Sequence, residues 1–258
     1  MLLEGKNVLI YGVRNERSIA WGCAQAMARE GARLALAYLG EREEKDVRKL
    51  VETLPNPSET IIASCDLTDD AQIEALHFAL KEKMGRLDAV VHGVAFAHKA
   101  DLAGRYVDTS RQGFLDALNV SAYTFVAAAR AALPLMTEGG SLITLSYLGS
   151  EKVVPNYNVM GVAKAALEAS VRYLAADLGP DRVRVNAISA GATMTLSARG
   201  ISGFSDMYRN VPSLAPLRIN TTIDQVGDMA AFLASDLSRG TTAEVIYVDS
   251  GMHALAEW

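Results

Sequence analysis

Tyr157 and Lys164 lie seven residues apart in the segment YNVMGVAK, a spacing that could support proton chemistry. On an α-helix, seven residues make almost two turns, so the phenol and the amine would point to the same side. Gly161, one turn after Tyr157, would leave this helix face uncrowded. A lysine charge favours an ionised or strongly polarised phenol, which is a good donor to an oxygen that gains negative charge. Ordinary amphipathic helices also carry this spacing, so the pair needs support from the rest of the chain.

Composition narrows the class of protein. The 258 residues, half of them hydrophobic, can form one large α/β domain or two small ones. A formal net charge of −5 predicts no surface for nucleic acid or for an anionic membrane. Cys23 and Cys65 lack metal-ligand spacing, so we expect reduced thiols, no metal site and a cytoplasmic location. Arg130 and Pro134 interrupt the apolar run FVAAARAALPLM, so no membrane span is expected.

Short apolar runs alternate with longer segments of helical period, which predicts βαβ units around a parallel sheet. Most of these runs are apolar throughout, as is typical of strands that helices cover on both faces. The expected strands are NVLIYG, RLALAY, TIIASC, DAVVHGVA, SLITLSY, VRVNAIS and EVIYVD. The expected helices span residues 19–30, 41–53, 70–84, 111–136, 157–178 and 223–235. We predict a single Rossmann-like, doubly wound domain over residues 1–258, with about seven parallel strands.

The segment 191–222 has no clear periodicity and contains Gly200, Gly203, Pro212 and Pro216. A loop of this length in a compact domain is usually functional. We therefore expect a lid over a site, with one or two short helices. A surface insertion without function is the alternative.

The first expected strand leads into GVRNERSIAWG, which could bind a dinucleotide phosphate. Gly12 suits the tight turn, and Ser18 could cap the next helix and donate its hydroxyl. Gly22 is small enough for close contact between helix and strand. The spacing differs from G-x-G-x-x-G, so an ordinary turn between strand and helix remains the alternative.

The second expected strand is followed by LGERE, where an acid would hold the ribose of NAD and a basic side chain would hold a 2′-phosphate. Leu39 comes first, with Glu41 and Arg42 beyond it, so NADH is expected and NADPH stays open. Asp66, at the end of the third expected strand, could accept a hydrogen bond from an adenine amino group. Asp69 is the better cap for the helix that follows.

The Tyr-x6-Lys pair follows the fifth expected strand and resembles the short-chain dehydrogenase/reductase superfamily. In that superfamily a serine usually precedes the tyrosine by about a dozen residues, where this chain has Thr144. Tyr147, ten residues ahead of Tyr157, makes the arrangement closely resemble the type I enoyl-[acyl-carrier-protein] reductases of bacterial fatty-acid synthesis. Other stretches resemble the same family up to about Gly251, namely RSIAWG, CDLTDDAQIEAL, VHGVAFA, GRYVDTSRQGFLDALNVSAY, VRVNAISAG and EVIYVDSG.

The resemblance implies NADH-dependent reduction of trans-2-enoyl thioesters of acyl carrier protein by a homotetramer. It implies that Tyr157 bonds the thioester oxygen, that Lys164 holds the nicotinamide ribose and that Tyr147 lines the acyl site. Implied coenzyme contacts are Gly12, Ser18, Ile19, Leu39, Asp66, Leu67, Val94, Thr193 and Thr195. Implied substrate contacts are Ala97 and Phe204, and further candidates for the wall of the acyl slot are Phe96, Met160 and Met207.

The chain departs from the family at a few positions. It reads AGATMTL where the family usually reads A-G-P-I-R-T-L, and it has Gly93 where a serine is usual. These departures bear on lid geometry and on pyrophosphate affinity. The acyl carrier is acidic, so a basic rim is expected, with Arg199 and Arg209 as candidates.

Two other functions remain open. A ketone or alcohol dehydrogenase would use Thr144 to polarise a carbonyl and Asn119 in a proton relay, whereas Tyr147 favours the enoyl reductase. A non-catalytic dinucleotide sensor on the same fold would be expected to lose the phenol or the amine, and both are present.

Overall fold

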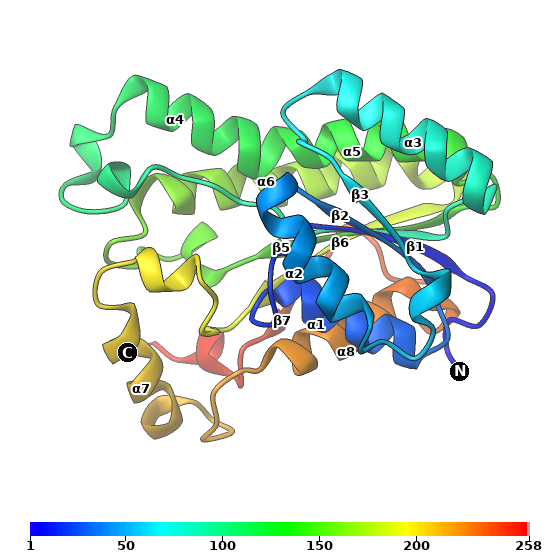
Figure 1. Cartoon of the computed structure of the whole chain (residues 1–258). Coiled ribbons are helices and arrows are strands. Elements are labelled where there is room, and N and C mark those ends of the chain that lie inside the picture. The colour runs from blue at the N-terminus through cyan, green and yellow to red at the C-terminus, as the bar shows by residue number, and fades with distance from the viewer. Residues whose placement is uncertain (257–258) are drawn as a thin grey trace.

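Seven parallel strands form one sheet in the computed structural model of the chain, which describes residues 1–256 (Figure 1). The strand order is β3-β2-β1-β4-β5-β6-β7, and every paired neighbour is parallel. All seven predicted strands are confirmed, as β1 (Asn7–Tyr11), β2 (Arg33–Tyr38), β3 (Ile61–Ser64), β4 (Ala89–His92), β5 (Gly140–Ser146), β6 (Val183–Ala190) and β7 (Val245–Val248).

Helices cover both faces of this sheet (Figure 1). One apolar layer joins the strands to α1 (Ile19–Arg29), α2 (Glu41–Val51) and α8 (Ile223–Ala234). The other layer joins them to α3 (Asp70–Met84), α5 (Thr124–Ala132) and α6 (Asn158–Leu178). Burial on two sides explains why the strands are mostly apolar, and it confirms the predicted doubly wound class.

The predicted helix over residues 111–136 is wrong as a single element. The chain forms α4 (Arg111–Leu118), a π-helical turn (Asn119–Tyr123) and α5, followed by a 3-10 turn (Leu133–Leu135). Thr124 donates to the carbonyl of Val120 at 2.6 Å and meets Nε2 of His92 at 2.8 Å. A polar contact across the core therefore accompanies the extra residue of the π turn, and periodicity within the helix carries no trace of that contact.

Gly22 has a different neighbour from the one expected. A methyl group on Gly22 would overlap the backbone of Ile223, and one on Gly227 would overlap the carbonyl oxygen of Gly22. The two glycines let the backbones of α1 and α8 touch. The expected contact between helix and strand at Gly22 is therefore corrected to a contact between two helices.

The segment 191–222 contains a 3-10 turn (Ala198–Gly200) and α7 (Phe204–Leu214), which confirms the expectation of one or two short helices. Asn156 donates from Nδ2 to the carbonyl of Ser202 at 2.9 Å, so the segment is tied to the residues just before Tyr157. No helix within residues 1–256 combines the length and the apolarity that a membrane crossing needs.

Candidate active site

The expected coenzyme site begins where β1 and β4 lie side by side. The connections from these two strands run to opposite sides of the sheet, which is the switch point where such sheets bind nucleotides. Gly12 has a φ of +90°, and a methyl group there would overlap the carbonyl oxygen of Gly93. Gly93 in turn donates to the carbonyl of Tyr11 at 3.1 Å. This tight backbone contact fits a dinucleotide turn, as expected for Gly12.

Ser18 does not cap α1 with its side chain, so that expectation is wrong. Its hydroxyl donates to the carbonyl of Asn15 at 2.7 Å and accepts from the N–H groups of Arg14 and Asn15. The serine instead fixes the loop ahead of the helix. First-turn N–H groups such as that of Ile19 then remain available to a bound anion, as coenzyme phosphate binding requires.

The expected adenosine contacts lie at the ends of neighbouring strands. Tyr38 and Ser64 pair in register, so Leu39 and Asp66 follow adjacent strand ends. Leu39 is 57% exposed, whereas Leu67 is buried. Oδ1 of Asp66 accepts from the N–H and the hydroxyl of Thr68. Asp69 caps α3 by accepting from the N–H groups of residues 71 and 72, as predicted.

Tyr157 and Tyr147 pack edge to face, with ring centroids 5.0 Å apart and an interplanar angle of 70°. They share one apolar cluster with Ala97 and Met160. Phe96, next to Ala97, is 44% exposed. The structure therefore brings together three expected substrate-site residues that lie far apart in the sequence.

The backbone around Tyr157 is held in an unusual conformation. Asn156 and Asn158 both have positive φ, at 62° and 34°. Asn158 donates from Nδ2 to the carbonyl of Gly104 at 3.2 Å, on the loop before α4. α6 begins at Asn158, one residue later than predicted, so Tyr157 is the N-cap residue of the helix.

The Tyr157 phenol is kept neutral by its surroundings. Burial raises its pKa well above the ordinary value, and the neighbouring Tyr147 and Glu168 raise the pKa further. Lys164 was expected to favour an ionised or a strongly polarised phenol, and the ionised form is corrected here because burial raises the pKa of Tyr157. Among residues 1–256 the Tyr157 hydroxyl has no hydrogen-bond partner, so it can donate to an incoming oxygen.

Lys164 lies on α6 behind Tyr157 and is 6% exposed. Its Nζ donates to the carbonyl of Leu145, at the end of β5, at 2.6 Å. Burial lowers the pKa of Lys164 to about 8. An ammonium carries three donors, so two remain for a ribose after the bond to Leu145.

A close backbone contact explains the glycine at position 161 more specifically than an uncrowded helix face does. A methyl group at Gly161 would come 2.6 Å from the carbonyl oxygen of Gly149. Gly149 belongs to the 3-10 turn Leu148–Ser150 that follows Tyr147. The glycine pair lets this turn lie against α6, which brings Tyr147 to Tyr157.

The remaining expected contacts are those to the coenzyme, after β4 and β6, and one to the substrate, on α7. Thr193 is buried just after β6, and Thr195 accepts from the N–H of Ala198 at 3.1 Å and so supports the following turn. Val94 packs against the core after β4. Phe204 is buried and stacks on Tyr208, whereas the Tyr147 hydroxyl meets Sδ of Met207 on α7 at 3.7 Å.

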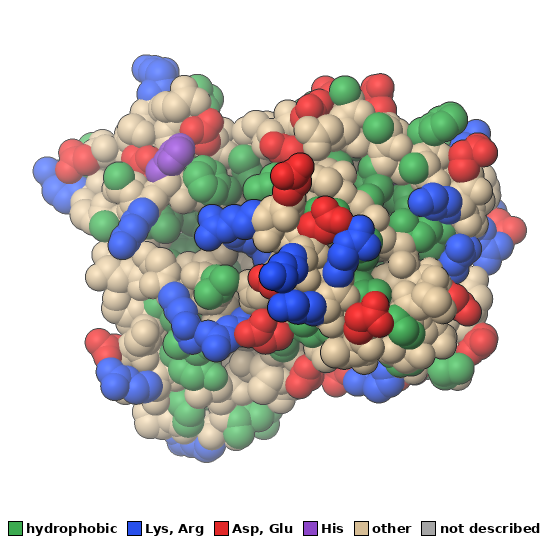
Figure 2. Space-filling model, viewed as in Figure 1, with side chains coloured by type: hydrophobic (Ala, Val, Ile, Leu, Met, Phe, Trp, Pro, Cys, Tyr) green, Lys and Arg blue, Asp and Glu red, His purple; other side chains and the backbone are tan. Residues whose placement is uncertain are grey.

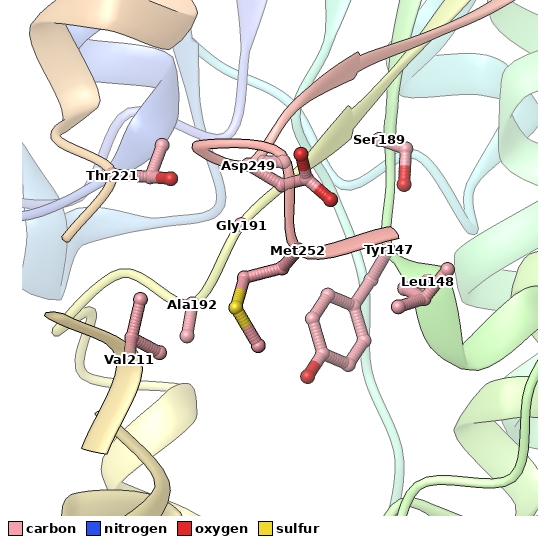
Figure 3. Close-up of a pocket in the computed structure, with 10 residues that line it drawn as sticks. Tyr147, Leu148, Ser189, Gly191, Ala192, Val211, Thr221, Asp249 and Met252 are labelled. Carbon is pink, nitrogen blue, oxygen red and sulfur yellow. The ribbon is translucent and has the colours of Figure 1, made fainter. Parts of the chain in front are cut away.

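A pocket lies between Tyr147 and Val211 of α7 (Figure 3). Figure 3 shows Tyr147 beside Met252, with Asp249 above them and Val211 on the opposite side. The pocket is lined by Tyr147, Leu148, Ser189, Ala190, Gly191, Ala192, Val211, Thr221, Asp249 and Met252. Met252 also packs against Val211 of α7. The residues after β7 thus support α7.

Thr144, which the ketone-dehydrogenase alternative would use, is poorly placed for that reaction. Thr144 is fully buried and its hydroxyl is bonded to His92, through Nδ1 at 3.1 Å and the carbonyl oxygen at 3.3 Å. A side chain sealed in the core cannot polarise a substrate carbonyl. Asn119 is exposed within the π-helical turn.

Sequence reasoning missed the residues that hold the site in place. Ser121 accepts from the N–H of Phe96 at 3.0 Å and donates to its carbonyl at 3.1 Å, so the π-helical turn fixes the loop that carries Ala97. His92 on β4 and Glu168 on α6 are both buried, and each interacts electrostatically with Lys164. The only available signal was a polar residue inside an otherwise apolar segment.

Within residues 1–256 no cluster of His, Cys, Asp and Glu has metal-binding geometry. The doubly wound sheet and the Tyr157–Lys164 pair are those of a short-chain dehydrogenase/reductase. The family model for "Enoyl-(Acyl carrier protein) reductase" matches residues 12–253. The chain belongs to the enoyl-acyl carrier protein reductase family.

Relatives in this family span almost the whole chain. The Bacillus subtilis enoyl-[acyl-carrier-protein] reductase [NADH] is 54% identical over 254 residues, or 98% of either chain. A crystal structure of the Bacillus cereus enoyl-acyl carrier protein reductase with NADP+ and indole naphthyridinone is 52% identical, with a TM-score of 0.97 and 99% of both chains covered. The Anaplasma phagocytophilum reductase in complex with NAD is 50% identical, with a TM-score of 0.94, and covers 100% of this chain and 97% of that one.

Proposed function

We propose that this chain reduces trans-2-enoyl thioesters of acyl carrier protein to saturated acyl thioesters with NADH, in fatty-acid elongation. The observation that carries the proposal is the hydroxyl of Tyr157 beside Tyr147, without a hydrogen-bond partner in the described part of the chain, with Lys164 fixed behind it at the end of β5. Family membership supports the same reaction.

The coenzyme, when bound, supplies a hydride to the β-carbon of the enoyl thioester. Electron density then moves onto the thioester oxygen, where Tyr157 donates a hydrogen bond that strengthens as the charge develops. The neutral phenol suits this role because it keeps its proton to donate. A proton delivered to the α-carbon completes the saturated product, so one hydride and one proton are taken up.

Lys164 has the role of holding the coenzyme in this mechanism. Its Nζ is anchored by Leu145 and keeps two donors for the ribose hydroxyls. Gly12 and the first turn of α1 would hold the pyrophosphate, and Asp66 and Leu39 would flank the adenosine. Thr193, Thr195, Ile19, Leu67 and Val94 remain proposed coenzyme contacts.

The acyl chain would lie against Tyr147, Ala97 and the lid. Burial raises the pKa of Tyr147 to about 12, so this phenol is also neutral and offers an apolar ring edge to the substrate. Its hydroxyl meets Met207 of α7, so entry of an acyl chain would require this part of the lid to move. We propose that residues 191–222 act as that lid.

We favour NADH because acidic side chains surround the arginines near the proposed adenosine site, where NADPH would place its 2′-phosphate. Arg42 is flanked on α2 by Glu41, Glu43 and Glu44, and Arg14 is paired with Glu43 at 3.3 Å. Figure 2 shows basic and acidic side chains mixed over this part of the surface. A 2′-phosphate would meet this negative charge, although the related NADP+ complex leaves NADPH open.

Two partner proposals accompany the reaction. The acidic carrier would meet Arg199 on the lid, whereas the ion pair between Arg209 and Asp206 weakens the contribution of Arg209. A homotetramer, as the resemblance implies, would cover the exposed side chains of Leu115 and Tyr173 on α4 and α6. Light scattering on the purified protein measures that assembly.

The proposed reaction is tested by following the loss of reduced-nicotinamide absorbance with crotonyl-coenzyme A, and separately with a panel of ketones. We expect consumption of NADH with the enoyl thioester and not with the ketones, and faster turnover with NADH than with NADPH. Consumption with ketones alone would favour the dehydrogenase, and NADH binding without oxidation would favour the sensor.

A further inference from the structure

Glu168 is a buried carboxylate that the proposed reaction does not use. It lies on α6 one turn after Lys164, and it is 5% exposed. Its Oε1 accepts hydrogen bonds from the hydroxyls of Ser146 and Ser150, the latter at 2.6 Å. The ion pairs within residues 1–256 do not include Glu168, so two serines, rather than a cation in contact, satisfy the acid.

A carboxylate is costly to bury, so its retention here calls for a reason. The two serines flank Tyr147, because Ser146 ends β5 and Ser150 ends the 3-10 turn Leu148–Ser150. One oxygen atom of Glu168 therefore fixes both sides of the short segment that presents the Tyr147 ring to Tyr157. The same segment is held from outside by the contact between Gly149 and Gly161.

We propose that Glu168 is a positioning residue of the reductase site, which fixes the Tyr147 segment through Ser146 and Ser150 and keeps Lys164 in its charged form. The inference rests on the proposed function, because it assigns to the same site a residue that acts through Tyr147 and Lys164. Glu168 touches neither substrate nor coenzyme in this scheme.

Glu168 acts on the charge of Lys164 because the two residues lie one turn apart on α6. Burial lowers the pKa of Lys164 to about 8, and the negative charge of Glu168 opposes that shift. Without Glu168, Lys164 would lose its proton closer to neutral pH. The charge on Lys164 would then be lost where the enzyme works, and with it the attraction for the coenzyme.

Other titratable groups around the pair do not change charge near pH 8. His92 on β4 has a pKa of about 3, lowered by burial and by Lys164, so it is neutral. Burial raises the pKa of Tyr147 to about 12 and also raises those of Tyr157 and of Tyr247 on β7. An alkaline loss of activity that starts near pH 8 therefore reports Lys164.

The test compares Glu168→Gln with the unmodified chain and with Asp177→Asn, which removes an exposed acid from the same helix. For Glu168→Gln we expect the alkaline limb of kcat/KM to move down by about one pH unit, since a nearby opposite charge changes a pKa by about 1–3 units. Nucleotide fluorescence should show the same downward move in the pH dependence of NADH affinity. Asp177→Asn should keep both profiles in place.

Ser150→Ala tests the positioning half and serves if Glu168→Gln does not fold. It leaves the charge in place and removes one donor, so we expect kcat/KM for the enoyl thioester to fall about 3–10-fold, the loss of roughly one hydrogen bond. NADH affinity and the alkaline limb should stay unchanged. Unaltered kinetics in Ser150→Ala, or an unmoved limb in Glu168→Gln, would overturn the inference. An unmodified chain without enoyl reductase activity would instead refute the proposed function.

Discussion

At the residue scale, the burial of Tyr157 decides how the site can act. A largely buried phenol keeps its proton, so it stabilises a developing negative charge by hydrogen bonding and not by prior ionisation. Its ring is also part of the apolar cluster that includes Tyr147 and Met160. The hydroxyl and the ring can therefore be tested separately.

Tyr157→Phe removes the hydroxyl and leaves the ring in its cluster. We expect kcat to fall about 10²–10³-fold, as is typical when one donor to a developing oxyanion is lost. NADH affinity should change by less than about twofold, because Lys164 and the strand ends hold the coenzyme. Stopped-flow turnover and fluorescence titration measure the two quantities, and equal losses in both would contradict the assigned role.

At the scale of elements, His92 connects β4, β5 and α5 through Thr144 and Thr124. Burial and the charge of Lys164 lower the pKa of His92 to about 3. The unfolded chain binds a proton at His92 below about pH 6.5, whereas the folded chain does not. The folded state therefore loses stability as the pH falls through this window.

His92→Gln keeps a neutral donor and acceptor and removes this titration. Between about pH 6 and pH 4, the free energy of unfolding of the unmodified chain should fall more steeply, by about 1.4 kcal/mol per pH unit, the value for one proton. Urea unfolding at several pH values measures the difference. Parallel pH profiles for the two proteins would show that His92 titrates normally.

The contact between α1 and α8 gives a second prediction at this scale. Gly227→Ala would push a methyl group into the backbone of Gly22, so we expect a loss of about 1–3 kcal/mol in the free energy of unfolding. Gly179→Ala is the matched control, since Gly179 has a φ of −56° and nothing lies within 4 Å of the new methyl group. Chemical denaturation compares them, and equal stabilities would argue against a tight helix contact.

Elements defined by local pattern were predictable, and those defined by distant contacts were not. The run RLALAY identified its strand because burial on two faces favours apolar residues at successive positions, as in its last five residues. The break at Asn119–Tyr123 accompanies a contact between Thr124 and His92, which no local period contains. Tyr157 and Lys164 were found by spacing, whereas Glu168 was hidden because its partners belong to β5 and the turn after it.

At the scale of the whole molecule, we propose that residues 1–258 form one domain with a lid at 191–222. All seven strands belong to one sheet, and the two apolar layers each join elements from both ends of the chain. Such a core is expected to unfold in one cooperative step. The lid contributes few of these buried residues and is the natural place for local opening.

Limited trypsin digestion tests this division. Arg199 is exposed on the lid, so we expect the first cut after Arg199 and two fragments that mass spectrometry identifies. NADH with a saturated acyl thioester should slow the cut, and Arg199→Gln should remove it. First cuts within the sheet, or no protection by ligands, would contradict the proposed lid.

The residues after β7 have a practical consequence for anyone who handles this protein. Met252 packs under α7, and Lys152 donates to the carbonyls of His253 and Leu255 at 3.0 Å and 3.4 Å. A purification tag fused after these residues would disturb the contacts that support the lid helix α7. One fused before Leu3 would emerge beside the end of α1, just ahead of β1 and so at the end of the sheet where the strands begin.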